Sequence, residues 1–283
     1  MRRGGADAIA LPVADGGEGT ADALSRGGEW HRVRVSDPLG RPVDAAWVLR
    51  EDGTAVVDSA AALGLPLLAD GERDPLRASS AGLGELLRAV LDTRPAAVVV
   101  GVGGTATVDG GAGLRAALRA WPDGVPLRVA CDVRSTLLEA AYVFAPQKGA
   151  TPDVVEELAR RLAADETLAP YAALPGAGAG GGLGAALAAL GGELVEGAQL
   201  VLDLIGFDRH ARTADLVVTG EGTVDETTFA GKAPGAVVAR CERLGVRCVL
   251  FGGRVLAGDA RALSGDPSRV REDLVALGED LAM

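Results

Sequence analysis

Short apolar runs that end in glycine and lead into helical patterns recur along this chain. Four of them span residues 8–17, 95–104, 214–222 and 246–253, and they are rich in Val, Leu and Ala without polar alternation. Apolar strands of this kind are typical of a parallel sheet that is covered on both faces. Amphipathic helical patterns follow at 81–93, 151–166 and 232–245. The sequence therefore predicts an α/β protein whose ligands collect outside the carboxyl ends of its strands.

Residues 30–60 have a different pattern. They alternate between apolar and polar residues, and they carry the turns DPLG at 37–40 and EDGT at 51–54, as antiparallel hairpins do. A chain of 283 residues also exceeds the size at which one core usually stops growing, so we expect two lobes, one of them with α+β character. The Gly-rich stretch at 176–192 favours a loop that feeds a helix N-terminus, with a disordered linker as the alternative.

Charge and residue usage exclude several classes of function. A net charge of -11 and a pI near 4.8 argue against nucleic acid and anionic membranes as partners. Two histidines, neither near a Ser or Cys turn, give no basis for a catalytic triad or a zinc site. Three cysteines without metal-ligand spacing, together with no export signal, predict reduced thiols and a cytoplasmic location.

Lysine is scarce and lies only in glycine-rich turns. Of the 28 basic residues two are lysines, Lys148 in APQKGAT and Lys232 in GEGTVDETTFAGKAP. A lysine supplies a compact point charge, which suits the neutralisation of a phosphoryl group during its transfer. The alternative is that two solvated turns simply retained lysine.

Five glycine turns carry charged or hydroxyl residues, at 14–20, 101–113, 145–151, 175–184 and 220–234. Glycine lets backbone N–H groups approach a ligand, and a helix N-terminus behind such a turn favours phosphate. None matches a Walker P-loop, and each taken alone is consistent with an ordinary βα connection. The carboxylates that could hold Mg²⁺ or accept a proton are Asp15, Asp109, Asp132 and Asp225. Asp132 follows the apolar run LRVAC at a strand end, where helix capping is the alternative role.

Taken together, the motifs resemble those of the bacterial glycerate kinases. The matching segments occur in the family's order and cover about residues 8–245: ADGGEGT, DPLGRPV, GGTATVDGGAG, CDV followed by VFAPQKGAT, PGAGAGGGLGAAL, and ADLVVTGEGTVDETTFAGKAP. The resemblance implies ATP-dependent phosphorylation of D-glycerate, with magnesium, to 2-phosphoglycerate. It also implies a flavodoxin-like (Rossmann-like) parallel-sheet lobe from residues 1–29 plus 193–283, and an inserted α/β lobe from 30–192, with the active site in the cleft between them.

The resemblance also implies roles for individual residues. The residues expected to act in catalysis are Asp15, Asp109, Lys148, Asp225 and Lys232. Those expected to contact substrate are Glu18, Thr20, Gly103, Gly104, Thr105, Arg134, Gln147 and Glu221. The cofactor-binding glycines are Gly178, Gly180, Gly181 and Gly182, and Asp132 is the candidate metal ligand. Which lobe holds ATP, which aspartate is the base, and whether position 2 or 3 is phosphorylated stay open at this point.

The sequence departs from the family pattern in several places. The family's opening strand and P-D-S-F-K-G motif are absent before the matching segment, and Val108, Thr223, Thr227 and the pair Ser135 and Thr136 replace common family residues. These departures raise the alternative of a relative that binds glycerate or nucleotide without phosphoryl transfer. A Rossmann-type oxidoreductase is favoured only by GAGAGG. The expected partners are small molecules, D-glycerate and ATP, and a homodimer is left open.

Overall fold

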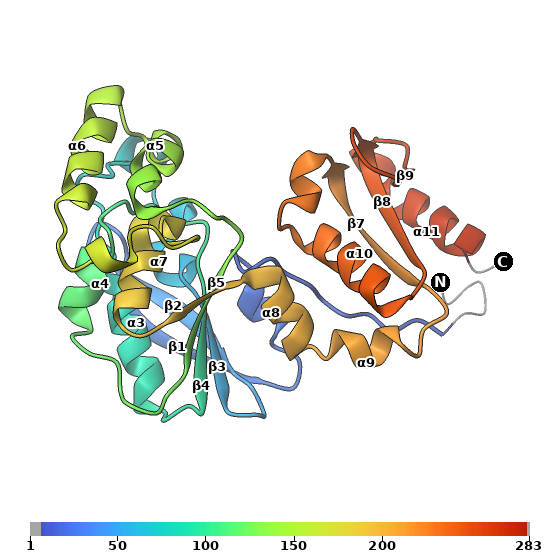
Figure 1. The fold of residues 1–283 in the computed structure, drawn as a ribbon, viewed down its shortest axis with the longest axis horizontal. Coiled ribbons are helices and arrows are strands. Elements are labelled where there is room, and N and C mark those ends of the chain that lie inside the picture. Colours follow the sequence, from blue (N-terminus) through green and yellow to red (C-terminus); the bar gives the residue numbers. More distant parts are fainter. Residues whose placement is uncertain (1–6, 282–283) are drawn as a thin grey trace. The chain divides into compact units, whose positions relative to one another are not determined.

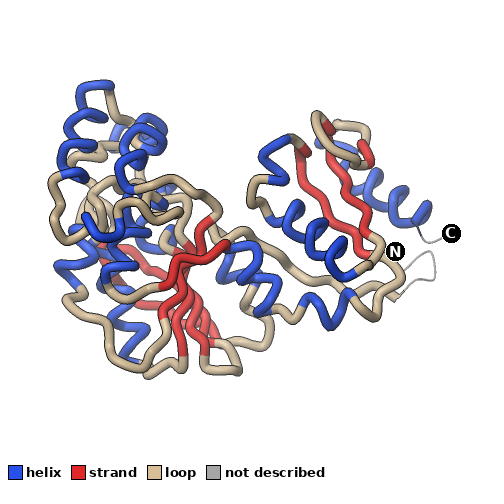
Figure 2. The backbone as a smooth tube through the Cα atoms, in the orientation of Figure 1, coloured by secondary structure: helices blue, strands red, loops and turns tan. Residues whose placement is uncertain are grey.

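The computed structural model describes residues 7–281, and the chain divides into two compact units. The larger unit is Ala14–Val201, and the smaller is Met1–Val13 with Leu202–Met283. Each mixes strands and helices, so the predicted α/β class with two lobes is confirmed (Figures 1 and 2). This division places residues 14–29 and 193–201 in the larger unit, whereas the sequence prediction assigned them to the lobe of the chain ends. The predicted domain boundaries stay a prediction.

The larger unit is built on a six-stranded sheet whose strands lie in the order of the sequence, β1 to β6. The strands are β1 (Glu29–Ser36), β2 (Pro42–Leu49), β3 (Thr54–Asp58), β4 (Ala97–Gly101), β5 (Leu127–Cys131) and β6 (Glu193–Glu196). The pairs β1–β2 and β2–β3 are antiparallel, which confirms the hairpins predicted at 30–60. From β3 to β6 every pair is parallel. β3 therefore ends the hairpin region and starts the parallel one.

Helices connect the parallel strands and cover the sheet. The α-helices of this part are α1 (Thr20–Ala23), α2 (Ala60–Leu63), α3 (Ala81–Asp92), α4 (Ala112–Ala117), α5 (Ala140–Phe144), α6 (Pro152–Ala163) and α7 (Ala179–Ala189), together with the start of α8 (Gly197–Leu204), which crosses the boundary after Val201. Short 3₁₀ helices lie at Leu65–Leu67, Asp70–Glu72, Leu137–Glu139, Pro146–Lys148 and Ala169–Tyr171. Because right-handed crossovers between successive neighbours always turn the same way, the connecting helices collect on one face. Figure 1 shows α3, α4 and α7 on that face and α8 on the other.

The main core lies between the sheet and α3 and α7. In α3 the apolar residues Leu83, Leu86, Leu87 and Val90 recur at helical spacing, and all four are fully buried. They belong to the same cluster as the sheet's inward valines and the buried leucines of α7. The predicted helix at 81–93 is thereby confirmed, as is the helix that the Gly-rich stretch feeds at 176–192.

The smaller unit contains a three-stranded parallel sheet in the order β7–β8–β9. Its strands are β7 (Val217–Val224), β8 (Cys248–Val255) and β9 (Arg261–Ala262), and its helices are α9 (Phe207–Ala211), α10 (Ala233–Leu244) and α11 (Val270–Leu281), with 3₁₀ helices at Glu226–Phe229 and Pro267–Arg269. The strands predicted at 214–222 and 246–253 and the helix predicted at 232–245 are confirmed. None of the helices within residues 7–281 is both long and apolar enough to cross a bilayer.

One predicted strand is wrong. Residues 8–17 form neither strand nor helix, and most side chains from Asp7 to Pro12 are exposed. A strand requires hydrogen bonds from a neighbour, and none of the described strands pairs with this segment. An apolar composition alone was insufficient to identify a strand here.

The packing of α3 generates a stability prediction. Leu87 is fully buried, whereas Leu138 is 53% exposed. We expect Leu87→Ala to lower the free energy of unfolding by about 2–5 kcal/mol, because it removes buried methyl groups and leaves a cavity. Leu138→Ala, the same chemical change at an exposed position, should have a much smaller effect. Urea denaturation followed by circular dichroism compares the two, and equal losses would contradict the assigned core.

Candidate active site

The carboxyl ends of the parallel strands meet at one edge of the larger unit's sheet. β3 ends at Asp58, β5 ends directly before Asp132, and β6 ends at Glu196. The parallel register from β3 to β6 places these ends side by side. The strand predicted before Asp132 is present as β5. Three carboxylates that are far apart in the sequence therefore share one edge.

The glycine turn at 14–19 lies directly against this edge. A Cβ atom added to Gly16 would lie 2.9 Å from the carbonyl carbon of Ala130, and one added to Gly103 would lie 2.8 Å from the Cα atom of Gly17. Backbones can approach this closely only where no side chain intervenes. The structure thus brings the first two predicted glycine turns together at the ends of β4 and β5.

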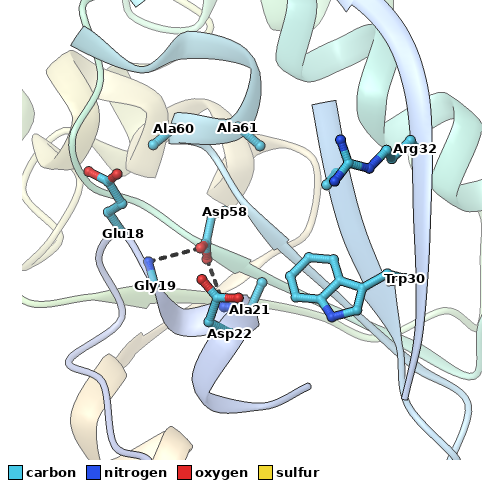
Figure 3. A pocket seen from close by; sticks show the side chains of 10 residues that line it. Glu18, Gly19, Ala21, Asp22, Trp30, Arg32, Asp58, Ala60 and Ala61 are labelled. Atoms are coloured by element: carbon cyan, nitrogen blue, oxygen red, sulfur yellow. Dashed lines mark hydrogen bonds between the residues drawn. The ribbon is translucent and has the colours of Figure 1, made fainter. Parts of the chain in front are cut away.

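Asp58 holds the end of this turn in place. Its carboxylate accepts hydrogen bonds from the backbone N–H groups of Gly19 at 2.9 Å and Ala21 at 3.0 Å (Figure 3). The pKa of Asp58 is raised to about 6, mainly by burial. The two hydrogen bonds lower it in part, and the charges of Asp22 and Glu18 contribute to the rise. Asp58 is not among the residues predicted from sequence for the site, although it ends the apolar run TAVVD.

Asp132 and Asp15 are two carboxylates at this sheet edge that interact electrostatically. Burial is the largest cause of the raised pKa of Asp132, and the charge of Asp15 adds to it. The side chain of Asp15 accepts a hydrogen bond from the N–H of Gly17 at 3.2 Å. Nearby in the sequence, Arg134 is exposed and pairs with Glu196 at 3.1 Å. The edge therefore carries an acidic pair beside an accessible guanidinium group.

Thr20 and Glu18, both predicted to contact substrate, differ in accessibility. Thr20 is fully buried, and its hydroxyl donates to the carbonyl of Gly17 at 2.8 Å. The hydroxyl therefore stabilises the turn. Glu18 is exposed, and its carboxylate has no hydrogen bond or ion pair with any residue in the described range 7–281.

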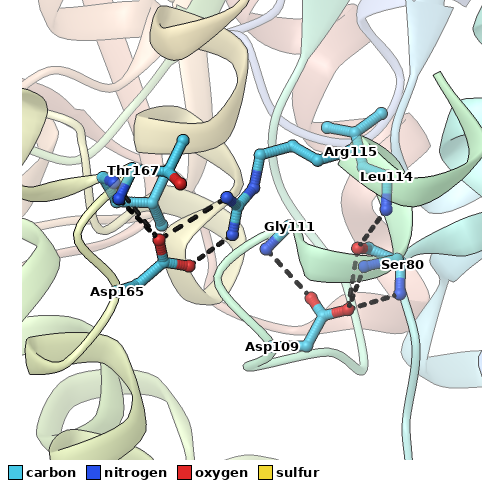
Figure 4. Close-up of polar contacts among 9 residues, drawn as sticks. Ser80, Asp109, Gly111, Leu114, Arg115, Asp165 and Thr167 are labelled. Atoms are coloured by element: carbon cyan, nitrogen blue, oxygen red, sulfur yellow. Dashed lines mark hydrogen bonds and ion pairs between the residues drawn. The ribbon is translucent and has the colours of Figure 1, made fainter. Parts of the chain in front are cut away.

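Asp109 organises the second turn. Its Oδ2 atom accepts from the N–H and the hydroxyl of Ser80, at 2.9 and 2.8 Å, and from the N–H of Gly113 at 3.1 Å. Its Oδ1 atom accepts from the N–H of Gly111 at 3.1 Å (Figure 4). Four donors on one carboxylate join the starts of α3 and α4. This arrangement explains an aspartate here by local structure, and its catalytic role stays a prediction.

Lys148 lies inside the larger unit, with only 4% of its surface exposed. Its Nζ atom donates to the carbonyl oxygen of Thr107 at 2.8 Å and contacts the hydroxyl of Thr105 at 3.3 Å. The ring of Phe144 lies 5.8 Å from the ammonium group. Burial lowers the pKa of Lys148 to about 7, and the charge of Asp109 opposes this shift in part. The lysine thus stabilises the loop after β4 by hydrogen bonds made inside the unit.

The predicted cofactor glycines lie at the start of α7 and are packed against other backbone. A Cβ atom at Gly181 would lie 2.2 Å from the carbonyl oxygen of Thr107, and one at Gly178 would lie 2.3 Å from that of Thr136. Gly180, Gly181 and Gly182 also have positive φ angles. Tight packing accounts for these glycines, and their contact with a cofactor stays a prediction.

The smaller unit gathers its own predicted residues at the end of β7. Lys232 Nζ lies 3.6 Å from an oxygen of Glu221 and 3.9 Å from one of Asp225. Glu221 also accepts a hydrogen bond from the hydroxyl of Thr228. Hydrogen bonds from Thr227 are the largest cause of the lowered pKa of Asp225. The three residues predicted in this segment therefore form one partly exposed cluster.

The other predicted substrate residues can also be located. Gly104 and Gln147 are exposed, and Thr105 is 3% exposed with its hydroxyl near Lys148 and the carbonyl of Gly180. The two exposed residues are accessible to a ligand. Thr105 instead packs inside the unit and stabilises the loop after β4.

The buried position of Lys148 generates a prediction about pH. The folded protein releases the proton of Lys148 near pH 7, whereas the unfolded chain holds it to its ordinary pKa of 10.5. Between these values the unfolded state binds more protons, so this lysine makes the free energy of unfolding rise with pH. We expect Lys148→Met to remove that part of the rise. Lys232→Met leaves Lys148 in place and should retain it.

Urea titrations at pH 7, 8, 9 and 10 measure the effect. A Lys148→Met protein whose stability follows the same pH slope as wild type would contradict the assigned pKa.

Comparison with known proteins identifies the family. The sequence matches the model of the glycerate kinase family over residues 2–122 and 118–268. It is 38% identical over 277 residues to glycerate 2-kinase of Escherichia coli K12, covering 80% of this chain and 71% of that protein. It is 39% identical over 273 residues to glycerate kinase of Bacillus subtilis 168, covering 81% and 72%.

A solved structure agrees with the sequence relatives. The crystal structure of a protein assigned as glycerate kinase 2 from Salmonella typhimurium LT2 superposes with a TM-score of 0.82 at 32% identity, covering 98% of this chain and 88% of that one. The two-sheet α/β architecture is therefore that of a family relative as well. This chain belongs to the glycerate kinase family.

Proposed function

We propose that this protein is a kinase that transfers the γ-phosphoryl group of ATP to the 2-hydroxyl of D-glycerate, which yields 2-phosphoglycerate and ADP. Membership of the glycerate kinase family, and relatives named glycerate kinase and glycerate 2-kinase, support this activity. One observation in the larger unit supports this activity most directly. The turn at 14–19, the loop after β4 and Asp132 all lie at one edge of the sheet.

The sheet edge offers the groups that phosphoryl transfer requires. The reaction forms a bond from the glycerate oxygen to the γ-phosphorus and breaks the bond from that phosphorus to the β-phosphate oxygen of ADP. The proton of the attacking hydroxyl must pass to a base, and we assign that role to Asp15. Arg134 is assigned to the glycerate carboxylate, because a guanidinium group matches a carboxylate in geometry and charge.

The residues present fit a magnesium ion that is bound together with a nucleotide. Mg²⁺ in such sites takes one or two carboxylates, with phosphate oxygens and water completing its shell. Asp132, with its raised pKa and the nearby charge of Asp15, is the carboxylate that we assign to it. Within residues 7–281 no group of three or more His, Cys, Asp and Glu could hold a metal by itself. A bound Mg²⁺ would neutralise charge on the transferring phosphoryl group.

We further propose that the smaller unit contributes to the same reaction through Lys232. Its side chain is 38% exposed, and its ammonium group lies near two carboxylates at the end of β7, so the lysine is accessible while being held in position. An ammonium group of this kind stabilises the charge of a phosphoryl group as it leaves ADP. The proposed compartment is the cytoplasm, where ATP is supplied.

Product analysis tests the activity. Purified protein incubated with D-glycerate, ATP and Mg²⁺ should form 2-phosphoglycerate, which phosphorus NMR separates from 3-phosphoglycerate. L-Glycerate serves as the control substrate. Absence of phosphoglycerate from folded protein would refute the proposed function, and formation of the 3-phosphate would refute its regiochemistry.

Asp132 provides a test of the sheet edge. We expect Asp132→Asn to lower kcat by on the order of 10²-fold or more, because one carboxylate that acts on the phosphoryl group is removed. Asp123→Asn makes the same change at an exposed turn and should leave kcat unchanged. Steady-state kinetics with both substrates saturating measures the difference. A fully active Asp132→Asn protein would remove this residue from the mechanism.

Lys232 provides the matching test of the smaller unit. Lys232→Ala should lower kcat by about 10²-fold, the scale for loss of one charge-stabilising donor. The control is Arg261→Ala, which removes an ion-paired cation of the same unit and should leave kcat at the wild-type value. Equal kinetics for the two variants would show that Lys232 plays no part in transfer.

A further inference from the structure

The larger unit contains a cavity that the roles assigned so far do not use. Its volume is about 710 Å³, and it lies between the first strand of the sheet and the turn that begins α1. Pockets that bind small organic molecules measure about 300–1,000 Å³. Glycerate is far too small to fill this space, which has room for a larger ligand.

The two sides of the cavity differ in chemistry. Trp30 and Arg32 come from β1 and are two residues apart, so both point to the same face of the sheet. Glu18, Asp22 and Asp58 lie opposite them (Figure 3). One side is therefore an aromatic ring beside a cation, and the other is a group of carboxylates.

Most of these polar groups lack partners within the protein. Among the described residues 7–281, the guanidinium group of Arg32 forms no hydrogen bond and no ion pair, and the indole N–H of Trp30 has no acceptor. The carboxylates of Glu18 and Asp22 likewise accept no hydrogen bond from any described residue. Arg34, by contrast, lies on the same strand face and pairs with Asp44 at 3.1 Å. The cavity thus combines free donors, free acceptors and a tryptophan residue that is 44% exposed.

The chemistry of these groups selects the class of ligand. Three carboxylates would repel an anion such as glycerate or a phosphate group. A neutral purine base stacks on an aromatic ring, and ribose hydroxyls donate to carboxylates. The group that fits both sides is a nucleoside.

We propose that this cavity binds the nucleoside part of ATP, with the base stacked on Trp30 and a ribose hydroxyl donating to Asp22. This inference rests on the proposed function, because it assigns a subsite to that reaction. The phosphates would extend out of the cavity toward the loop after β4. That loop borders the cavity, since a Cβ atom at Gly104 would lie 3.0 Å from Glu18 and 3.5 Å from Ala60.

Four variants test the subsite. Trp30→Ala should raise the KM for ATP and the Kd for ADP by at least about 10-fold, the scale of one lost stacking contact. Trp30→Phe keeps an aromatic face and should stay close to wild type. Asp22→Asn should weaken ADP binding by about 10-fold, because the ribose hydroxyl then donates to a neutral acceptor and not to a charged one. Arg34→Gln is the matched control outside the cavity and should change neither value.

The measurements are steady-state kinetics for both substrates and calorimetry with ADP, 2′-deoxy-ADP and 3′-deoxy-ADP. The KM for glycerate should not change in any of the four proteins. Wild type should discriminate against at least one deoxynucleotide, and Asp22→Asn should discriminate less strongly. Circular dichroism and a urea midpoint verify that each variant is folded, which a surface tryptophan on a strand should permit.

The outcomes separate the subsite from the activity. If wild type phosphorylates glycerate but Trp30→Ala and Asp22→Asn retain wild-type affinity for ADP and ATP, the subsite is refuted and the function stands. If wild type binds ADP in a manner that depends on Trp30 but forms no phosphoglycerate, the function is refuted and the subsite stands. If it neither binds ADP nor forms product, both are refuted.

Discussion

Parallel hydrogen bonding from β3 to β6 is the constraint on which the larger unit depends. It places the carboxyl ends of four strands at one edge, so that Asp58 and Asp132 share this edge although they are far apart in the sequence. The strands follow one another without a reversal of order, so the connecting helices collect on one face. The other face is left to α8, α1 and the cavity beside Trp30. The strand order and the parallel pairing thus determine both where the carboxylates lie and which face of the sheet carries the cavity.

Glycine and buried polar groups then shape the loops at that edge. The turn at 14–19 can touch the strand ends because its glycines carry no side chain. Asp109 and Lys148 fix the loop after β4 from inside the unit, one by accepting four hydrogen bonds and the other by donating to Thr107. A charged residue in a glycine turn can therefore serve a ligand or the turn itself, and residue type does not distinguish the two.

Predictions from sequence were correct where the periodicity of apolar residues was strong. They were wrong or incomplete where the structure depended on which strands pair. The helix at 81–93 and the hairpins at 30–60 were identified correctly, because helical spacing and alternation are local properties. The strand at 8–17 was wrong, because a strand also needs a partner. Asp58 was missed for a related reason: its segment was interpreted as part of a hairpin, and only the pairing of β3 with β4 turns its last residue into a strand-end carboxylate.

By itself the sequence determined the fold class, the identity of the glycine turns and the family, since each is written in local pattern and ordered motifs. Tertiary structure alone decided which polar groups form hydrogen bonds inside the protein and which remain available to a ligand. Lys148 is buried beneath a loop while Asp22 and Arg32 face an open cavity, and the charge of these residue types does not distinguish the two environments. The physical reason is that burial and hydrogen-bond satisfaction depend on contacts between distant segments, which no local pattern records.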